Sequence, residues 1–277
     1  MMDVIAISSL DVPELQPYRT LRQSVEHFRE GIFIAEGEKV VRRLAESRLI
    51  ILSVLITPEW LDEYRPLLEA RPEPIRVFTA SKNILETIVG YHMHQGIMAL
   101  GKIPVPAVLE SVLAGAPRPY LFVALDGLAD SENLGVVVRN CAAFGVHGIL
   151  VGETSGSPYL RRAVRNSMGT VFTLPIVYCR NLIETVGLLR TRYGISVLAA
   201  HPHTEEHTLF TTDCTKDICL VLGSEGNGIS PGVLAACDKA VAVPMHGNVD
   251  SLNVASACAV FLYEVIRQRQ PASPAKT

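Results

Sequence analysis

The stretch from Asp217 to Glu264 constrains the fold more than any other part of the chain. A short apolar run, Ile218 to Leu222, ends abruptly in the glycine loop Gly223 to Gly228. A second run, Ala240 to Val243, ends at a proline, and a polar loop and a long apolar-periodic helix follow. This order of elements is typical of an α/β protein whose ligand site lies where parallel strands end. We therefore expect an α/β fold with its functional site in these loops.

Composition narrows the class of protein further. The 277 residues suffice for two ordinary domains, and a 48% hydrophobic content suits buried parallel strands. The net charge of −3 gives no general attraction to nucleic acid, so any phosphate binding must be local. The first residues lack a signal-peptide pattern and no apolar run reaches membrane-spanning length, so we expect a cytoplasmic protein with no membrane partner. The six cysteines show no metal-binding spacing and are expected to be buried, reduced thiols.

The chain divides into two expected domains joined by a linker. Alternating strands and helices close a small α/β domain over residues 1–102, whose first helix carries apolar residues from Leu15 to Phe28. Residues 103–119 are punctuated by prolines and a glycine, which indicates a linker. Residues 120–277 form the second domain, where we expect a parallel sheet covered on both faces. Its expected strands are Tyr120–Leu125, Gly148–Val151, Phe172–Pro175, Ile195–Ala199, Ile218–Leu222 and Ala240–Val243. Its expected helices are Asn133–Phe144, Tyr159–Asn166, Leu182–Arg192, Pro231–Ala236 and Ser251–Arg267.

The first candidate motif runs from Leu125 to Asn140. A strand ends at Asp126, a polar turn follows, and a helix begins near Asn133. Arg139 then lies about two turns into an otherwise apolar helix. Such an arginine either binds an anion or emerges at the surface as an ordinary solvated side chain.

The second candidate motif is the glycine loop from Gly223 to Gly228. It has neither the GxGxxG pattern of dinucleotide-binding proteins nor the GK[ST] ending of a P-loop. Glu225 would repel a phosphate, but it could orient an arginine or bind a cationic group. The loop could equally be a tight turn between a strand and a helix.

The third candidate motif runs from Met245 to Asn253. Ser251 precedes an apolar run and is therefore a candidate helix N-cap. Asn253, in the expected first turn, could bond to the backbone or to a ligand. By itself this segment predicts only a cap.

Two weaker patterns remain. Arg161, Arg162 and Arg165 form the densest basic cluster, which could grip phosphates or form a solvated helix face. His92 with His94, and His201 with His203, have the HxH spacing, but no second pair of ligands accompanies them. We therefore expect no metal.

Together the three motifs resemble the SpoU (TrmH) family of RNA ribose 2′-O-methyltransferases, within the SPOUT superfamily. The resemblance is carried by Leu125–Val151, Leu220–Ser230 and Val243–Glu264, in the family's order, with support from Arg165–Gly169 and from His94–Ile97. The first half resembles the family's ribosomal-protein-like substrate-binding domain. The resemblance implies a C-terminal α/β trefoil-knot methyltransferase domain preceded by this smaller N-terminal α/β domain. It also implies S-adenosylmethionine as cofactor, RNA as substrate and a homodimer formed through the knotted domain.

The resemblance carries over residue by residue. It implies Arg139, Asn133, Glu225, Ser251 and Asn253 as catalytic residues. It implies Gly223, Val243 and Leu252 as cofactor-binding residues, with Met245 and Ala200 as neighbours. Ser131 and Asn140-Cys141 depart from the family's usual Pro and Thr-Ala, which could alter loop stiffness or pocket shape. Apolar residues of the final helix, Val260, Phe261 and Val265, are candidates for the dimer surface.

The implied reaction is methyl transfer to a ribose 2′-hydroxyl of structured RNA, with ribosomal RNA ahead of transfer RNA as the substrate. We expect Arg139 to stabilise the 2′-oxygen or an adjacent phosphate electrostatically, with Glu225 and Asn133 orienting it. Arg139 as a general base is the second alternative, because an arginine stays protonated up to pH ~12. Two other functions are weighed: a non-catalytic RNA-binding or ribosome-assembly factor on the same scaffold, and an α/β enzyme that binds another nucleotide at the glycine loop. The sequence decides neither the RNA, nor the nucleotide, nor any role in antibiotic resistance.

Overall fold

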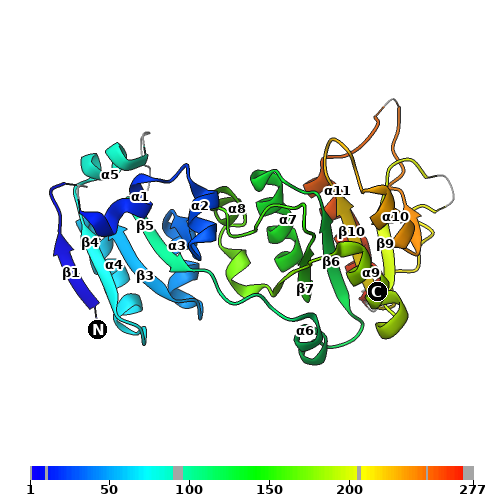
Figure 1. The fold of residues 1–277 in the computed structure, drawn as a ribbon, viewed down its shortest axis with the longest axis horizontal. Coiled ribbons are helices and arrows are strands. Elements are labelled where there is room, and N and C mark those ends of the chain that lie inside the picture. The colour runs from blue at the N-terminus through cyan, green and yellow to red at the C-terminus, as the bar shows by residue number, and fades with distance from the viewer. Residues whose placement is uncertain (1, 10–11, 90–95, 205–206, 248, 271–277) are drawn as a thin grey trace, which may run out of the picture. The chain divides into compact units, whose positions relative to one another are not determined.

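The computed structural model describes residues 2–9, 12–89, 96–204, 207–247 and 249–270. It separates into two compact units (Figure 1). Unit 1 comprises Met1–Val105 together with Ser157–Thr173, and unit 2 comprises Pro106–Gly156 together with Leu174–Thr277. The chain therefore passes from one unit to the other three times.

Unit 1 is built on a mixed five-stranded sheet with the strand order β1-β4-β3-β5-β2. The pairs β1–β4 and β3–β4 are parallel, whereas β5 runs antiparallel to both of its neighbours. The strands are β1 (Met2–Ala6), β2 (Ile32–Glu36), β3 (Ile51–Ile56), β4 (Ile75–Thr79) and β5 (Ile97–Lys102). The helices are η1 (Pro13–Leu15), α1 (Gln16–Arg19), α2 (Ser24–Arg29), α3 (Glu38–Glu46), α4 (Pro58–Glu69), α5 (Lys82–Val89), α8 (Arg161–Asn166) and η2 (Thr170–Thr173).

Unit 2 is built on a six-stranded sheet in which every pair of neighbours is parallel, with the order β11-β9-β10-β6-β7-β8. The expected parallel sheet is thereby confirmed. The strands are β6 (Leu121–Asp126), β7 (Gly148–Val151), β8 (Ile176–Tyr178), β9 (Ser196–Ala200), β10 (Ile218–Gly223) and β11 (Lys239–Val241). The helices are α6 (Leu109–Gly115), α7 (Ser131–Ala143), α9 (Leu182–Tyr193), α10 (Pro231–Ala236) and α11 (Val254–Arg269).

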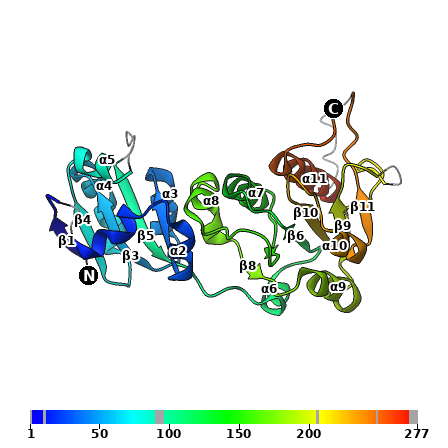
Figure 2. The ribbon, with the colours of Figure 1, turned by 45° about the horizontal axis from the view of Figure 1, so that its top comes forward.

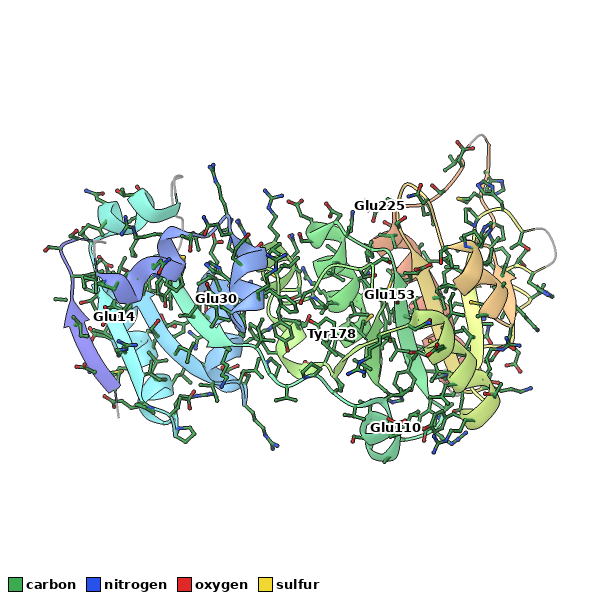
Figure 3. All side chains as sticks on the ribbon, viewed as in Figure 1. Glu14, Glu30, Glu110, Glu153, Tyr178 and Glu225 are labelled. Carbon is green, nitrogen blue, oxygen red and sulfur yellow. The ribbon has the colours of Figure 1, made fainter. Side chains whose placement is uncertain are left out.

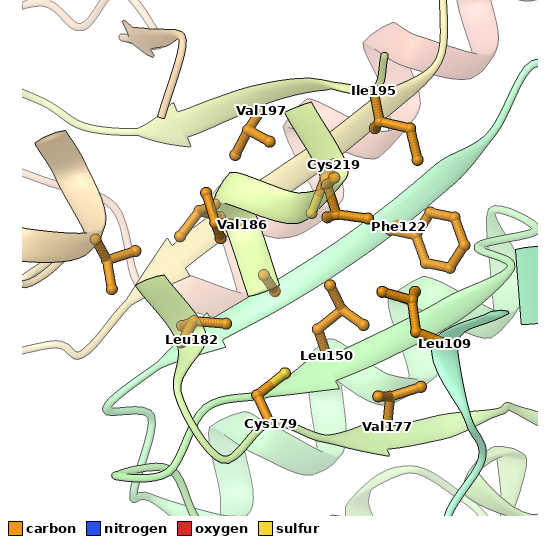
Figure 4. Packing of buried hydrophobic residues seen from close by; sticks show 14 of the residues in the cluster. Leu109, Phe122, Leu150, Val177, Cys179, Leu182, Val186, Ile195, Val197 and Cys219 are labelled. Carbon is orange, nitrogen blue, oxygen red and sulfur yellow. The ribbon is translucent and has the colours of Figure 1, made fainter. Parts of the chain in front are cut away.

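Helices cover both faces of this second sheet, as the near-continuous apolar strands require. Figure 2 shows α7 and α11 on one face and α6, α9 and α10 on the other. The core under α6, α9 and α10 consists of alternate strand residues such as Phe122, Leu150 and Val197 with helix residues such as Leu182 and Val186 (Figure 4). Since both faces are filled, the ends of the strands are the places where a ligand could reach the sheet.

Several element predictions were wrong in detail. Phe172 lies in the 3-10 helix η2, and the strand expected at Phe172–Pro175 comes later, as β8. The Phe172 ring packs against Phe33 of β2, with ring centroids 5.3 Å apart, and Phe33 also contacts Tyr159 at 5.4 Å. The single helix expected from Leu15 to Phe28 is divided into η1, α1 and α2. Long-range packing and a turn determine the conformations of these segments. Local periodicity in the sequence detects neither.

Other expectations concern the thiols and membrane segments. All six cysteines are free; five are buried and Cys237 is half-buried. Within the described ranges, every helix is too short or too polar to span a bilayer. The expected His92 and His94 pair, and His94 and Gln95 of the supporting motif, lie outside the described residues.

Candidate functional site

A cavity of about 310 Å³ opens in unit 2 beside the carboxyl ends of β9, β10 and β11. The loops that follow these three strands form its walls. All five residues expected to bind the cofactor line this one cavity: Ala200, Gly223, Val243, Met245 and Leu252. Its volume is at the lower end of the ~300–1,000 Å³ of typical small-molecule sites.

The glycine loop folds back on itself at the cavity. Ser224 and Gly228 exchange two backbone hydrogen bonds of 2.9 Å each, so the loop closes after only five residues. A Cβ on Gly223 would lie 2.2 Å from the carbonyl carbon of Gly228, which no real side chain tolerates. Gly228 itself has φ +67°, the left-handed conformation that glycine adopts without strain. These two glycines are therefore required by the loop itself, not only by close approach of a ligand.

Asp126, at the end of β6, anchors the far side of this loop. The residue is 8% exposed, and its carboxylate accepts a 2.7 Å hydrogen bond from the backbone N–H of Ser230. Gly223 is the β10 partner of Asp126 in the sheet. One buried carboxylate thus ties the first motif to the second, which the sequence analysis did not recognise.

Three predicted catalytic residues from three separate motifs meet in one hydrogen-bond network. The Asn133 amide donates to the Glu225 carboxylate, and the Asn253 amide donates to Asn133 Oδ1 at 3.0 Å. Asn253 also lies within 3.5 Å of Glu225 Oε1. Figure 3 shows the Glu225 side chain in the loop that follows β10. The network joins the helix α7, the glycine loop and the start of α11, three segments that are distant in sequence.

The start of α11 differs from the prediction. The helix begins at Val254, and its N-cap is Asn253, not Ser251. Asn253 Oδ1 accepts hydrogen bonds from the N–H groups of Ala255 (3.0 Å) and Ser256 (3.4 Å). Asn253 therefore satisfies the helix terminus with its oxygen while its nitrogen holds Asn133. Ser251 is exposed and lines the cavity.

Arg139 lies on α7, at a position where the helix is exposed to solvent. Among the residues that the structure describes, no hydrogen bond or ion pair engages its guanidinium. The expected orientation of Arg139 by Glu225 and Asn133 is not seen as a direct bond, because Asn133 and Asn253 hold that carboxylate. Of the described residues that line the cavity, none is Arg139, Asn133 or Asn253.

The basic cluster lies in unit 1, where it is partly committed to an ion pair. Arg161 donates a 2.6 Å hydrogen bond to Glu36, a carboxylate at the end of β2 whose side chain is 7% exposed. Arg165 lies 3.6 Å from the other oxygen of Glu36, but its own side chain is 57% exposed. Arg162 is exposed. Arg161 thus stabilises a buried charge, and Arg165 and Arg162 face solvent.

The charge of the cavity wall selects the kind of ligand. Two carboxylates, Glu225 and Asp250, line it, and its described wall contains no lysine or arginine. Leu222, Val243 and Leu252 supply apolar surface. Such a wall disfavours a polyphosphate and suits a ligand with an apolar part and a positive charge.

Two cavity features were missed or misassigned by the sequence analysis. His201 and His203, considered only as metal ligands, line the cavity, with ring centroids 5.9 Å apart. Within the described ranges, no three His, Cys, Asp or Glu side chains are grouped to hold a metal ion. Asp250 was passed over, although a carboxylate next to Ser251 and Leu252 was a usable signal.

The fold and the cavity define an α/β protein with a site suited to a cationic, partly apolar ligand at the carboxyl edge of a parallel sheet. Two family models match the chain: the SpoU rRNA Methylase family over residues 120–263, and RNA 2′-O ribose methyltransferase substrate binding over residues 34–105. The chain therefore belongs to the SpoU rRNA methylase family.

Individual relatives agree with this assignment. The chain is 32% identical to the uncharacterized tRNA/rRNA methyltransferase Rv0881 of Mycobacterium tuberculosis, over 99% of this chain and 95% of the relative. It is 32% identical to the 23S rRNA (guanosine-2′-O-)-methyltransferase RlmB of Ralstonia nicotianae, over 70% of this chain and 78% of the relative. The crystal structure of the SpoU methyltransferase AviRb from Streptomyces viridochromogenes with AdoMet is similar at a TM-score of 0.79 and 25% identity, covering 93% of this chain and 99% of that one.

The protein is an RNA methyltransferase that uses S-adenosylmethionine. The cavity fits this cofactor on its own chemistry, since the ligand carries a sulfonium, an ammonium and a carboxylate, and so a net positive charge, beside an apolar-faced adenine. Glu225 and Asp250 complement the positive charge, and the apolar wall complements the ring.

Proposed function

We propose that this enzyme methylates the ribose 2′-hydroxyl of a nucleotide in structured RNA, with ribosomal RNA as the preferred substrate class. The observation that carries the proposal is the network of Asn133, Glu225 and Asn253 beside a cavity with an acidic and apolar wall. The name of RlmB, a 23S rRNA 2′-O-methyltransferase, and the match of residues 34–105 to a 2′-O ribose methyltransferase substrate-binding model support it.

In this proposal the chain's own residues bind the RNA and the cofactor, and one of them supplies the charge that stabilises the reacting oxygen. When bound, S-adenosylmethionine supplies an activated methyl group, and the 2′-oxygen must be aligned with it. Arg139 is the exposed cation of the first motif and would bind the 2′-oxygen or an adjacent phosphate. Because an arginine remains protonated at neutral pH, Arg139 would stabilise negative charge on the oxygen as the methyl group is transferred, and the hydroxyl proton would pass to solvent water.

Glu225 has a different role in this proposal. Two amides hold its carboxylate in the described structure, so it fixes the glycine loop to α7 and α11. Ser251 lines the cavity, where it would contact the nucleotide or the cofactor. Alignment would supply most of the acceleration, since effective molarities of well-oriented reactants reach ~10⁵ M or more.

Replacing Arg139 tests this assignment. We expect Arg139→Ala to lower methyl transfer by at least about 100-fold, because one preorganised charge contributes ~10²–10³ in rate. Calorimetric titration should give an S-adenosylmethionine affinity within about threefold of the wild type, since Arg139 is not part of the cavity wall. Undiminished transfer by the variant would refute the role of Arg139.

The RNA target is tested in cells. Mass-spectrometric mapping of 2′-O-methylated nucleosides should find one ribosomal RNA position that is methylated only when the gene is present. A difference confined to transfer RNA would change the substrate class, and a methyl group on a base would overturn the proposed chemistry.

Unit 1 is the proposed RNA-binding part, on the support of the substrate-binding model over residues 34–105. Arg162 and Arg165 are the better candidates for phosphate contacts because they are exposed, whereas the Arg161 side chain is only 16% exposed. An RNA substrate of this class would place the enzyme in the cytoplasm.

The proposal includes the trefoil knot and a homodimer formed through unit 2. Of the expected dimer residues on α11, Phe261 and Val265 are buried in their own subunit, so that part of the prediction was wrong. Val260 is exposed, and exposed Tyr263 of α11 and Val136 of α7 lie on the same pair of helices. These three side chains are the revised candidates for an isologous interface.

A further inference from the structure

Asn140 is a polar side chain at the packed contact between α7 and α11, next to Arg139 in sequence. Its Nδ2 donates a 2.8 Å hydrogen bond to the backbone oxygen of Ala255, in the first turn of α11. The side chain is half-buried, so its amide is not simply solvated. In the sequence, Asn140 stands out only as a departure from the family's usual Thr.

A second hydrogen bond joins the first turn of α11 to α7. Asn133 and Asn140 are seven residues apart, two helical turns, and so lie on one face of α7. Asn133 accepts from Asn253, the N-cap of α11, and Asn140 donates to Ala255, two residues further on. Asn253 itself accepts from Ala255 N–H. The first turn of α11 is therefore fixed to α7 at two points.

The contact between α7 and α11 also contains small apolar side chains. Cys141 of α7 and Cys258 of α11 are both fully buried, and burial raises the pKa of the Cys141 thiol, so it stays neutral. The hydrogen bond from Asn140 to one particular carbonyl adds a directional restraint to this apolar contact.

We infer that Asn140 is a positioning residue for methyl transfer: it sets α7, which carries Arg139, against the turn of α11 that follows Leu252 and Asn253. The inference rests on the proposed function. Arg139 and the cofactor cavity belong to different segments, so their alignment depends on this contact. A misplacement of about 1 Å away from the reacting atoms can cost on the order of 10²-fold in rate.

The test compares Asn140→Asp with Asn140→Gln. Aspartate keeps the shape but replaces the donor with a carboxylate that repels the Ala255 carbonyl. Glutamine keeps an amide donor on a longer side chain. We expect Asn140→Asp to lower kcat by about 10- to 100-fold, with the S-adenosylmethionine Kd within about threefold of the wild type. Asn140→Gln should recover part of the lost kcat.

Gln268→Ala is the matched control. Gln268 lies near the other end of α11 and also donates from a side-chain amide to a backbone oxygen, that of Thr212, at 3.0 Å. Removing this hydrogen bond in Gln268→Ala should lower the melting temperature of the protein. It should not change kcat when kcat is measured well below the melting temperature.

The possible outcomes distinguish the role of Asn140 from the proposed function of the enzyme. Equal kcat for Asn140→Asp and the wild type overturns the inference and leaves the proposed function standing. The inference is also overturned if Gln268→Ala lowers kcat as well, and if in both variants the fall in kcat is proportional to the loss of stability. The fall in kcat would then reflect impaired folding and not a misplaced Arg139. A wild-type enzyme with no 2′-O-methyl transfer refutes the proposed function, and the inference with it.

Discussion

At Gly223, the requirement for glycine comes from the protein's own backbone. The Gly228 carbonyl carbon occupies the space of a Cβ, so any side chain must open the loop that forms one wall of the cavity. Glycine loops near cofactors are usually explained by the ligand, but here the loop alone imposes the restriction.

The corresponding prediction concerns Gly223→Ala. We expect its S-adenosylmethionine affinity to fall by roughly tenfold or more, a loss of about 1.4 kcal/mol, as measured by calorimetry. Gly187→Ala is the control: Gly187 lies in α9, and a Cβ added there would meet nothing within 4 Å. This variant should gain about 0.5–1 kcal/mol in stability with unchanged affinity. If both variants bind the cofactor like the wild type, the loop tolerates the shift and this account is wrong.

The resemblance to the SpoU family predicted which residues gather at the site better than it predicted what each one does. Ala200, Gly223 and Leu252 were expected at one cavity and lie there. The expected N-cap at Ser251 was wrong, because serine and asparagine cap helices almost equally well and only the contact with Asn133 selects Asn253. Asp126 and Asn140 bond to backbone atoms of remote segments, and no local pattern reveals such partners.

At the scale of elements, the start of α11 combines a structural and a functional task. Asn253 caps the helix and also joins Asn133 and Glu225. In α9, Asn181 makes the same kind of cap, accepting from Glu184 N–H at 3.1 Å, away from the cavity. The chain thus contains two asparagine caps in its described helices, of which only Asn253 belongs to the site.

The two caps permit a matched comparison. Asn253→Ala and Asn181→Ala should each lower the free energy of unfolding by about 0.5–2 kcal/mol, measured by urea denaturation. Asn253→Ala should in addition lower methyl transfer by about tenfold or more, since Asn133 and Glu225 lose a shared partner. Equal activity in the two variants would show that Asn253 acts only as a cap.

Strands and helices of unit 2 could largely be predicted because their apolar periodicity is strong. The strand expected at Phe172–Pro175 failed because Phe172 packs on Phe33, which lies far earlier in the chain. β1 was not predicted, since Met2–Ala6 is short and acquires its conformation by pairing with β4. Local sequence patterns do not predict secondary structure where a long-range contact determines the backbone conformation.

At the scale of the whole molecule, each unit contains an imidazole that resists protonation. Burial lowers the pKa of His27 in unit 1, where its Nε2 lies 2.8 Å from Thr20 Oγ1. Burial, with the charge of Arg269, lowers the pKa of His147 in unit 2, whose Nδ1 accepts from Leu121 N–H at 3.1 Å. The unfolded chain, with ordinary imidazoles whose pKa is about 6.5, therefore binds more protons than the folded chain as the pH falls through that value.

Acidification should consequently destabilise both units. We expect the melting temperature to fall between about pH 7.5 and pH 5.5, and His147→Gln to show a smaller fall because glutamine does not titrate and can still accept from Leu121 N–H. Hydrogen bonds from Arg267 and Gln268 lower the pKa of Glu264 to about 2. Glu264 therefore keeps its full contribution to the stability of the fold throughout this pH range. A melting temperature that stays flat across this range would contradict the prediction.

The division at residues 103–119 remains a prediction. The sequence offered no sign that Ser157–Thr173 groups with unit 1, because its apolar residues look like those of any helix in unit 2. Only contacts between distant segments, such as Phe33 with Tyr159 and Phe172, reveal it.

Those aromatic contacts limit how the molecule can be dissected. A fragment beginning at residue 106 would retain Tyr159 and Phe172 but lose Phe33, and the guanidinium of Arg161 would lose Glu36. Two rings that are covered in the intact chain would then face water, which favours aggregation. We therefore expect a fragment that starts at residue 106 to be less soluble than the intact chain, and attempts to isolate unit 2 should keep the strand that carries Phe33.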